Sequence, residues 1–160
     1  MTAQQTDWLL IDGYSLLYRA RALSKLSGRN LAVERHLLIR KVEQGASDWA
    51  DRITIVFDGR ATKLGNDEIP STVEVLYAPG HLTADSVIER LVYANPESAR
   101  ILVVSSDRAE RETVAAAGAD TLSCGEFLDR IEGRTSHHRR RPPSAEGRAA
   151  RLGDFFPRTD

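Results

Sequence analysis

The stretch Trp8-Leu9-Leu10-Ile11-Asp12-Gly13 decides the fold, because a continuous apolar run closed by Asp-Gly is typical of a strand buried on both faces of a parallel sheet. The same pattern returns at Ile53–Phe57, which is followed directly by Asp58. It returns again at Ile101–Val104, where two serines separate the strand from Asp107. In open parallel sheets ligands bind beyond the carboxyl ends of the strands, so we expect these three aspartates to share one edge.

Segments between these strands show helical periodicity or shorter strand signals. Alternating strands and helices predict right-handed crossovers, and hence an α/β fold of three layers with a central parallel sheet of about five strands and helices on both faces. We predict helices at Leu31 to about Ala50, Thr83 to about Tyr93, about Arg108 to Ala117 and Gly125 to Ile131, further strands at Val73–Tyr77 and Asp120–Leu122, and a polar loop at Arg60 to Ser71.

Composition places the chain among ordinary globular proteins. It has 160 residues, 41% of them hydrophobic, which is enough for one domain with a buried core. The longest apolar runs are about five residues, far below the roughly 20 that span a bilayer, so we expect a cytoplasmic protein without a membrane partner. Cys124 is the single cysteine, which excludes an intramolecular disulfide and a cysteine-rich zinc site and favours a small buried residue beside Leu122.

Charge divides the chain into a body and a tail. Residues 1–133 hold 15 Lys or Arg against 20 Asp or Glu, whereas residues 134–160 hold 7 Arg against 3 acids. We therefore predict a domain over 1–133 and a basic, proline-containing tail over 134–160. The cluster His137-His138-Arg139-Arg140-Arg141 suits salt-sensitive RNA binding, although a role in solubility is nearly as well supported.

The acidic set points to metal-assisted phosphate chemistry. Asp85 falls in the first turn of a predicted helix, and Glu89 lies one turn later on the same face. Clustered carboxylates repel one another unless a cation neutralises them, and carboxylate oxygens suit Mg²⁺ or Mn²⁺. One or two such ions activate water and stabilise the transition state of phosphodiester hydrolysis. Each acid also has a structural alternative: Asp12 and Asp58 as turn residues, Asp85 at a helix start, and Asp107 as a helix cap.

Four short motifs, taken together, resemble a known family. The chain is similar to the YacP-like NYN domain, a branch of the PIN-like ribonucleases, over nearly its whole length. The resemblance rests on Ile11-Asp12-Gly13-Tyr14-Ser15, Val56-Phe57-Asp58-Gly59-Arg60, Thr83-Ala84-Asp85-Ser86-Val87-Ile88-Glu89 and Val104-Ser105-Ser106-Asp107-Arg108-Ala109-Glu110, in this order and spacing.

This resemblance implies a PIN-like fold and a metal-dependent endoribonuclease. It implies metal ligands at Asp12, Asp85 and Asp107, supported by Asp58 and Glu89. One residue departs from the family pattern Asp-Gly-Tyr-Asn: Ser15 stands where the family has an amide. A serine hydroxyl can still hydrogen-bond a metal-bound water or a phosphate.

Other residues near the strand ends are candidates for contacts with RNA. Arg60 and Arg108 lie within two residues of an acid and could meet phosphates, as could the tail residues Arg139, Arg140 and Arg141. Tyr14 could stack a base or only pack against a helix.

The sequence thus predicts an endoribonuclease that binds Mg²⁺ or Mn²⁺ and acts on RNA, either free or presented by a ribonucleoprotein. The main alternative is a catalytically weak RNA-binding or regulatory protein that keeps the fold. A metal-dependent phosphatase or a nuclease for branched DNA is less favoured, because the chain has no room for the helical arch and helix-hairpin-helix of flap nucleases. The sequence does not indicate the oligomeric state.

Overall fold

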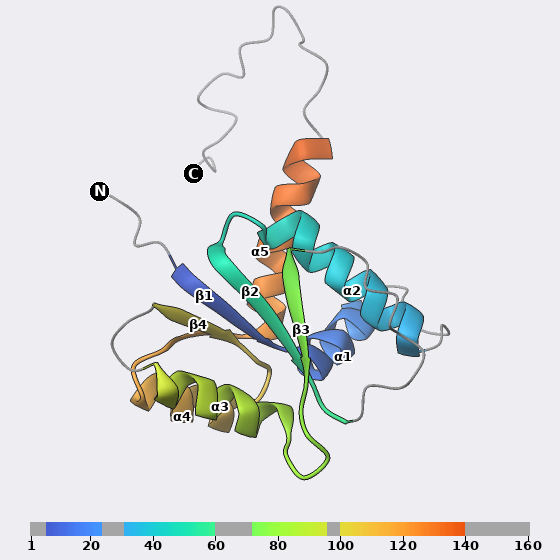
Figure 1. Ribbon diagram of the computed structural model, residues 1–160. Helices are drawn as coiled ribbons and strands as arrows, with labels where there is room; N and C mark the ends of the chain where they lie inside the picture. Colours follow the sequence, from blue (N-terminus) through green and yellow to red (C-terminus); the bar gives the residue numbers. More distant parts are fainter. Residues whose placement is uncertain (1–5, 24–30, 60–71, 96–99, 140–160) are drawn as a thin grey trace, which may run out of the picture.

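The computed structural model describes residues 6–23, 31–59, 72–95 and 100–139, with the side chains of residues 21–23 and 134–139 excepted. Strands and helices alternate along most of this length (Figure 1). In chain order the elements are β1 (Thr6–Asp12), α1 (Gly13–Leu23), α2 (Leu31–Ala46), β2 (Ala50–Phe57), β3 (Val73–Tyr77), α3 (Ala84–Ala94), β4 (Ile101–Val104), α4 (Arg108–Ala116), β5 (Asp120–Leu122) and α5 (Cys124–Arg139).

The five strands form one parallel sheet in the order β3-β2-β1-β4-β5. Ile11 pairs with Ile55 on one side and with Val104 on the other, so the carboxyl ends of β1, β2 and β4 lie level. Strand order reverses direction at β1, with β2 on one side and β4 on the other. A parallel sheet offers its ligand site at such a switch point, and here the switch point is the carboxyl end of β1.

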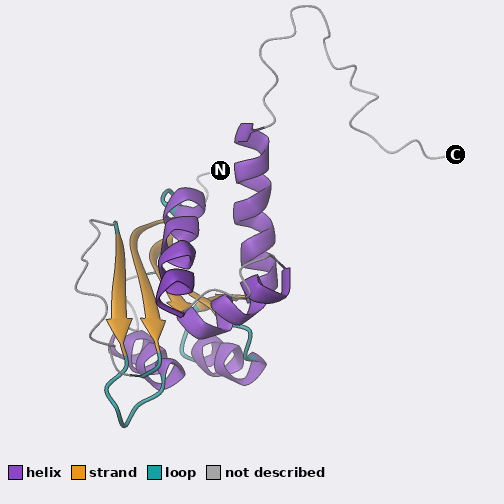
Figure 2. Ribbon diagram, turned by 90° about the vertical axis from the view of Figure 1, so that its right-hand side faces the viewer, coloured by secondary structure: helices purple, strands orange, loops and turns teal. Residues whose placement is uncertain are grey.

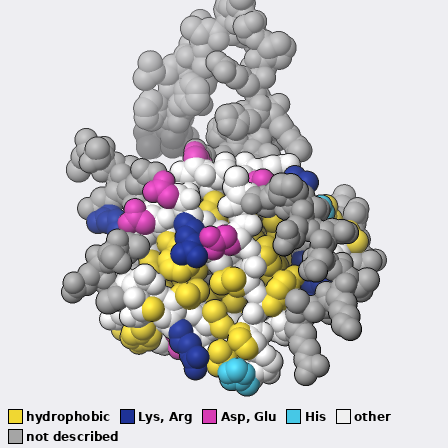
Figure 3. Space-filling view, in the orientation of Figure 1, with side chains coloured by type: hydrophobic (Ala, Val, Ile, Leu, Met, Phe, Trp, Pro, Cys, Tyr) yellow, Lys and Arg dark blue, Asp and Glu magenta, His cyan; other side chains and the backbone are white. Residues whose placement is uncertain are grey.

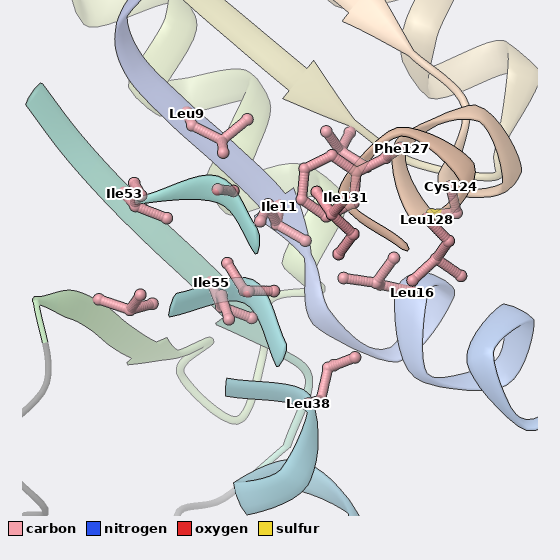
Figure 4. Close-up of a cluster of buried hydrophobic side chains, with 14 of the residues drawn as sticks. Leu9, Ile11, Leu16, Leu38, Ile53, Ile55, Cys124, Phe127, Leu128 and Ile131 are labelled. Carbon is pink, nitrogen blue, oxygen red and sulfur yellow. The ribbon is translucent and has the colours of Figure 1, made fainter. Parts of the chain in front are cut away.

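Helices cover both faces of the sheet, which confirms the three-layer prediction. Helices α1, α2 and α5 enclose the larger core, in which side chains from β1 and β2 meet Leu16, Leu38 and Phe127 (Figure 4). The second face is covered by α3 and α4, whose Ile88 and Val114 pack on Trp8 and other sheet residues. Figure 1 shows α3 and α4 on one side of the strands and α1 and α2 on the other. In the part of the chain that the structure describes, no helix is long and apolar enough to cross a membrane.

The predicted strands are all present, but the helices differ from the prediction at three places. Helix α1 was not predicted as an element. Helix α2 ends at Ala46, four residues before the predicted end, because β2 already begins at Ala50. Helix α5 was predicted to end at Ile131 but continues through Gly133 to Arg139, so residues 134–139, which we assigned to the basic tail, are helical. No proline lies between the start of α5 at Cys124 and Pro142, and Thr, Ser, His and Arg are all tolerated in a helix.

Gly13 allows α1 to begin immediately after β1. A Cβ atom at this position would lie 2.4 Å from the Phe57 ring and 3.0 Å from the Ile55 side chain. Only a residue without a side chain lets the chain turn from strand to helix at this depth. The first turn of α1 is therefore held against the end of β2, beside Asp12.

Candidate functional site

Asp12 ends β1 and lies at the centre of the site. It is 8% exposed, and its Oδ1 accepts a hydrogen bond from the backbone N–H of Ser15 at 3.3 Å. Burial raises the pKa of Asp12, hydrogen bonds from the backbone and hydroxyl of Ser15 oppose this, and the charge of Asp58 adds to it. Ser15, which departs from the family pattern, thus supports the Asp12 carboxylate directly.

Glu110 is a site residue that the sequence analysis did not select. It lies in the first turn of α4, is 2% exposed, and accepts a hydrogen bond on Oε2 from the hydroxyl of Ser105 at 2.5 Å. Burial raises its pKa to about 8, and the neighbouring charges of Asp12 and Asp85 contribute. Among the described residues its Oε1 has no hydrogen-bond partner. A buried carboxyl oxygen without a partner is costly unless something binds it.

Asp58 and Asp85 join the end of β2 to the start of α3. Asp58 follows β2, and its Oδ1 accepts the backbone N–H of Ala84, the first residue of α3. Asp85 is half-buried in the first turn, and its Oδ1 accepts the hydroxyl of Thr83 at 2.9 Å. The charge of Asp58 raises the pKa of Asp12, and the charge of Asp85 raises the pKa of Glu110. The structure therefore brings Asp12, Asp58 and Asp85 into one electrostatic group with Glu110.

Asp107 caps α4. Its Oδ1 accepts the backbone N–H groups of Ala109 at 2.9 Å and Glu110 at 3.3 Å, and its side chain is exposed. This is the structural alternative noted for Asp107 above, and binding of a metal by this residue stays a prediction. Glu89 is half-buried on α3, one turn after Asp85, and its role as a ligand also stays a prediction.

The described acids are suited to a hard divalent cation, although they do not form a closed coordination sphere. No group of three or more His, Cys, Asp or Glu side chains within the described ranges is arranged to hold a metal as it stands. The fit rests instead on oxygen donors gathered at the switch point and on the buried Glu110 Oε1 that lacks a partner. Asp12 and Glu110 could hold such an ion, with Asp85 and Asp58 beside them.

Tyr14 belongs to an aromatic row beside the acids. Its ring packs edge-on against Phe57, with centroids 5.2 Å apart, and its hydroxyl accepts a hydrogen bond from Arg35 Nη1 at 3.2 Å. Phe57 in turn stacks on Tyr77, and Tyr14 contacts Tyr18. These contacts fix Tyr14 in a half-buried position, the packing role that the sequence analysis left open.

The arginine candidates are less well placed. Arg108 is strongly exposed and pairs with Glu112 along α4, its Nε 3.1 Å from Oε1. Arg60, Arg140 and Arg141 lie outside the described residues, and the side chain of Arg139 does too. Figure 3 shows one face of the molecule, on which apolar side chains gather centrally and charged ones lie around them singly or in small groups. That face carries no continuous basic stripe among its described residues.

Cys124 has the structural role that the sequence predicted. It is fully buried at the start of α5 beside the acidic group. Burial raises the pKa of its thiol to about 12, and the charges of Asp12 and Glu110 contribute. A thiol that stays protonated at neutral pH is neither a nucleophile nor a metal ligand.

The chain forms a three-layer parallel α/β domain with acids at its switch point, which is the architecture that the resemblance to PIN-like proteins implied. Comparison with known proteins narrows this: the model of the YacP-like NYN domain matches residues 9–152. The chain belongs to this family, as the sequence motifs predicted.

Relatives from Bacillus subtilis support the assignment. The chain is 32% identical to the protein YacP of strain 168 over 128 residues, which cover 79% of this chain and 75% of YacP. The crystal structure of Rae1 (YacP) superposes with a TM-score of 0.67 at 30% identity, covering 84% of this chain and 80% of the other. Its W164L mutant superposes with a TM-score of 0.65 at 28% identity and the same coverage.

Proposed function

We propose that this protein is an endoribonuclease that hydrolyses RNA with Mg²⁺ or Mn²⁺ held at the carboxyl end of β1. The observation that carries the proposal is the buried pair of carboxyl groups, Asp12 and Glu110, at the switch point of the sheet. The Oε1 atom of Glu110 has no hydrogen-bond partner among the described residues. Two buried carboxyl groups side by side are unfavourable when both are ionised, and a divalent cation removes that cost. Membership of the YacP-like NYN family supports the same chemistry.

The residues divide the work by position. Asp12 and Glu110 provide the deepest oxygens, and Ser15 and Ser105 orient them by hydrogen bonds. Asp85 and Asp58 stand at the start of α3 within electrostatic reach of this pair, and we include Asp107 and Glu89 as outer ligands. A bound divalent cation supplies an activated water and neutralises charge on the phosphate.

The test is a cleavage assay with a matched control. Purified full chain is incubated with labelled single-stranded RNA, and with DNA of the same base sequence, in Mn²⁺, Mg²⁺ or EDTA. Asp12→Asn keeps the shape of the side chain but removes its charge. The control Asp51→Asn makes the same change at an exposed residue near the start of β2, at the opposite edge of the sheet.

We expect metal-dependent RNA cleavage that falls at least about 100-fold in Asp12→Asn, since loss of outer-shell partners alone costs 10–100-fold. Asp51→Asn should cleave like the wild type. Calorimetric titration with Mn²⁺ should show weaker binding to Asp12→Asn and unchanged binding to Asp51→Asn. If wild type and Asp12→Asn leave RNA equally intact in metal, the chain is not a nuclease. Retained RNA binding in that case would support the alternative of a regulatory RNA-binding protein.

A further inference from the structure

We propose that Tyr18, on the exposed side of α1, stacks a base of single-stranded RNA next to the cleavage site. This inference rests on the proposed function for its ligand class, and it places base contact at a residue that neither the family motifs nor the acidic group includes.

Tyr18 is the most exposed large apolar side chain of the described residues, at 62%. It lies one helical turn after Tyr14, so the two rings share a face of α1, with centroids 6.3 Å apart and planes inclined by 33°. One side of the Tyr18 ring is therefore supported by protein. A ring supported in this way loses little entropy when a base stacks on it.

The ring behind Tyr18 is held in place by several contacts. Tyr14 is fixed by its contact with Phe57 and by the hydrogen bond from Arg35 to its hydroxyl. Phe57 stacks on Tyr77, with ring centroids 5.9 Å apart, and the Arg35 guanidinium lies 5.9 Å from the centroid of the Tyr77 ring. The row thus begins at the ends of β2 and β3 and finishes at the exposed Tyr18.

The row also lies at a suitable distance from the acids. Helix α1 begins directly after Asp12, and the five helical steps from Gly13 to Tyr18 advance about 8 Å. That distance corresponds to roughly two nucleotides at the 3.4 Å rise of a stacked strand. A scissile phosphate near Asp12 would therefore leave a neighbouring base within reach of Tyr18.

A positive charge on the residue next to Tyr18 favours a nucleotide over an apolar peptide. Arg19, the next residue, extends to the first turn of α5, where its Nε and Nη2 lie 3.2 Å from the point at which a Gly125 side chain would begin. Consecutive residues of a helix do not face each other, so Arg19 lies on a neighbouring face of α1, where it could meet a phosphate of the strand whose base stacks on Tyr18.

Tyr93 provides the matched control. It is similarly exposed, at 58%, and lies near the end of α3 in the opposite layer. Among the described residues no ring contact joins Tyr93 to the aromatic row. Removal of either tyrosine takes away a similarly exposed ring, but only Tyr18 belongs to the aromatic row that begins at the ends of β2 and β3.

The experiment measures RNA binding without cleavage. Full-length Asp12→Asn protein is titrated against a fluorescein-labelled single-stranded RNA of ten nucleotides, and anisotropy gives the dissociation constant. Tyr18→Ala, Tyr18→Phe and Tyr93→Ala are each added to this background. A series of RNAs of the same length, each with an abasic site at a different position, locates the stacked base.

We expect Tyr18→Ala to weaken binding about 10-fold, because stacking of one base on an aromatic ring is worth 1–3 kcal/mol. Tyr18→Phe and Tyr93→Ala should stay within twofold of the parent. At one abasic position the parent should lose the same factor, and Tyr18→Ala should lose nothing further. Equal binding by Tyr18→Ala and the parent, or an equal loss in Tyr93→Ala, overturns the inference. If the wild-type chain cleaves RNA but Tyr18→Ala does not weaken binding, only the inference about Tyr18 is overturned. If Tyr18→Ala weakens binding but the wild-type chain does not cleave RNA, only the proposed activity is overturned. No binding by the parent overturns the inference.

Discussion

Replacement of Glu110 by glutamine should change how stability depends on pH in the metal-free protein. Glu110 keeps its proton in the folded state up to about pH 8, against an ordinary value of 4.5. Between these values the unfolded chain has released the proton and the folded chain has not. Folding stability is therefore fully present below about pH 4.5 and is lost as the pH rises through 8.

The size of the effect follows from the shift. One pKa unit corresponds to 1.36 kcal/mol, so a rise from 4.5 to about 8 corresponds to at most about 4 to 5 kcal/mol. Asp12 lies beside Glu110 and the two groups titrate together, so the measured loss belongs to the pair. For a chain of this length, that loss lowers the melting temperature on the order of 10 °C.

The assay is urea unfolding in EDTA at pH 5 to 8.5. The wild type should lose roughly 4 kcal/mol more than Glu110→Gln across this range, because the amide has nothing to titrate. Glu112→Gln is the control: it lies on the same helix with an exposed side chain, and its pH curve should be parallel to that of the wild type. Excess Mn²⁺ at pH 8 should restore stability to the wild type by binding the ionised pair. Parallel curves for the wild type and Glu110→Gln would refute the reasoning.

Two further predictions concern the scaffold, and both are measured by the midpoint of denaturant unfolding. Gly45→Ala should destabilise by about 1 kcal/mol or more, because its Cβ would lie 2.7 Å from Ile131 Cβ and would push α5 away from α2, whereas Gly80→Ala, with nothing within 4 Å, should change little. Thr54→Val should cost about 1–3 kcal/mol, since the buried Thr54 hydroxyl accepts the Trp8 indole N–H at 2.9 Å and donates to Glu74 at 3.0 Å. Thr113→Val, which removes a hydrogen bond on the surface of α4, should cost less; equal losses at Thr54 and Thr113 would contradict this account.

The strands and their acidic ends could be predicted because each is a local pattern. A buried parallel strand is a short apolar run, and the residue after it must lie at the carboxyl edge whatever the rest of the chain does. Helix α1 was missed because Asp12 was assigned to the end of a strand, whereas its carboxylate also caps α1 by accepting the backbone N–H of Ser15. Leu16, Leu17 and Ala20 at helical spacing were the available signal, and all three are buried in the larger core.

Glu110 was missed for a more instructive reason. It stands three residues after the capping residue Asp107, which is the spacing of a capping box, where the glutamate would turn back to the backbone N–H of the cap. In this structure that N–H donates instead to the hydroxyl of Ser105, at 3.0 Å. Ser105 thereby frees Glu110 to turn into the site, and it donates its own proton to Glu110 Oε2. This arrangement depends on the burial of Ser105, which the spacing of residues in the sequence does not indicate.

The direction of α5 sets a minimum length for any RNA that would contact both the acids and the far end of this helix. The helix starts beside the acids at Cys124 and runs antiparallel to the strands for 16 residues, about 24 Å (Figure 2). The last residue of the helix, Arg139, therefore lies at the edge of the domain remote from Asp12. A stacked single strand covers that distance in about seven nucleotides, so a strand bound at Asp12 would need about this length to reach the last turn of α5.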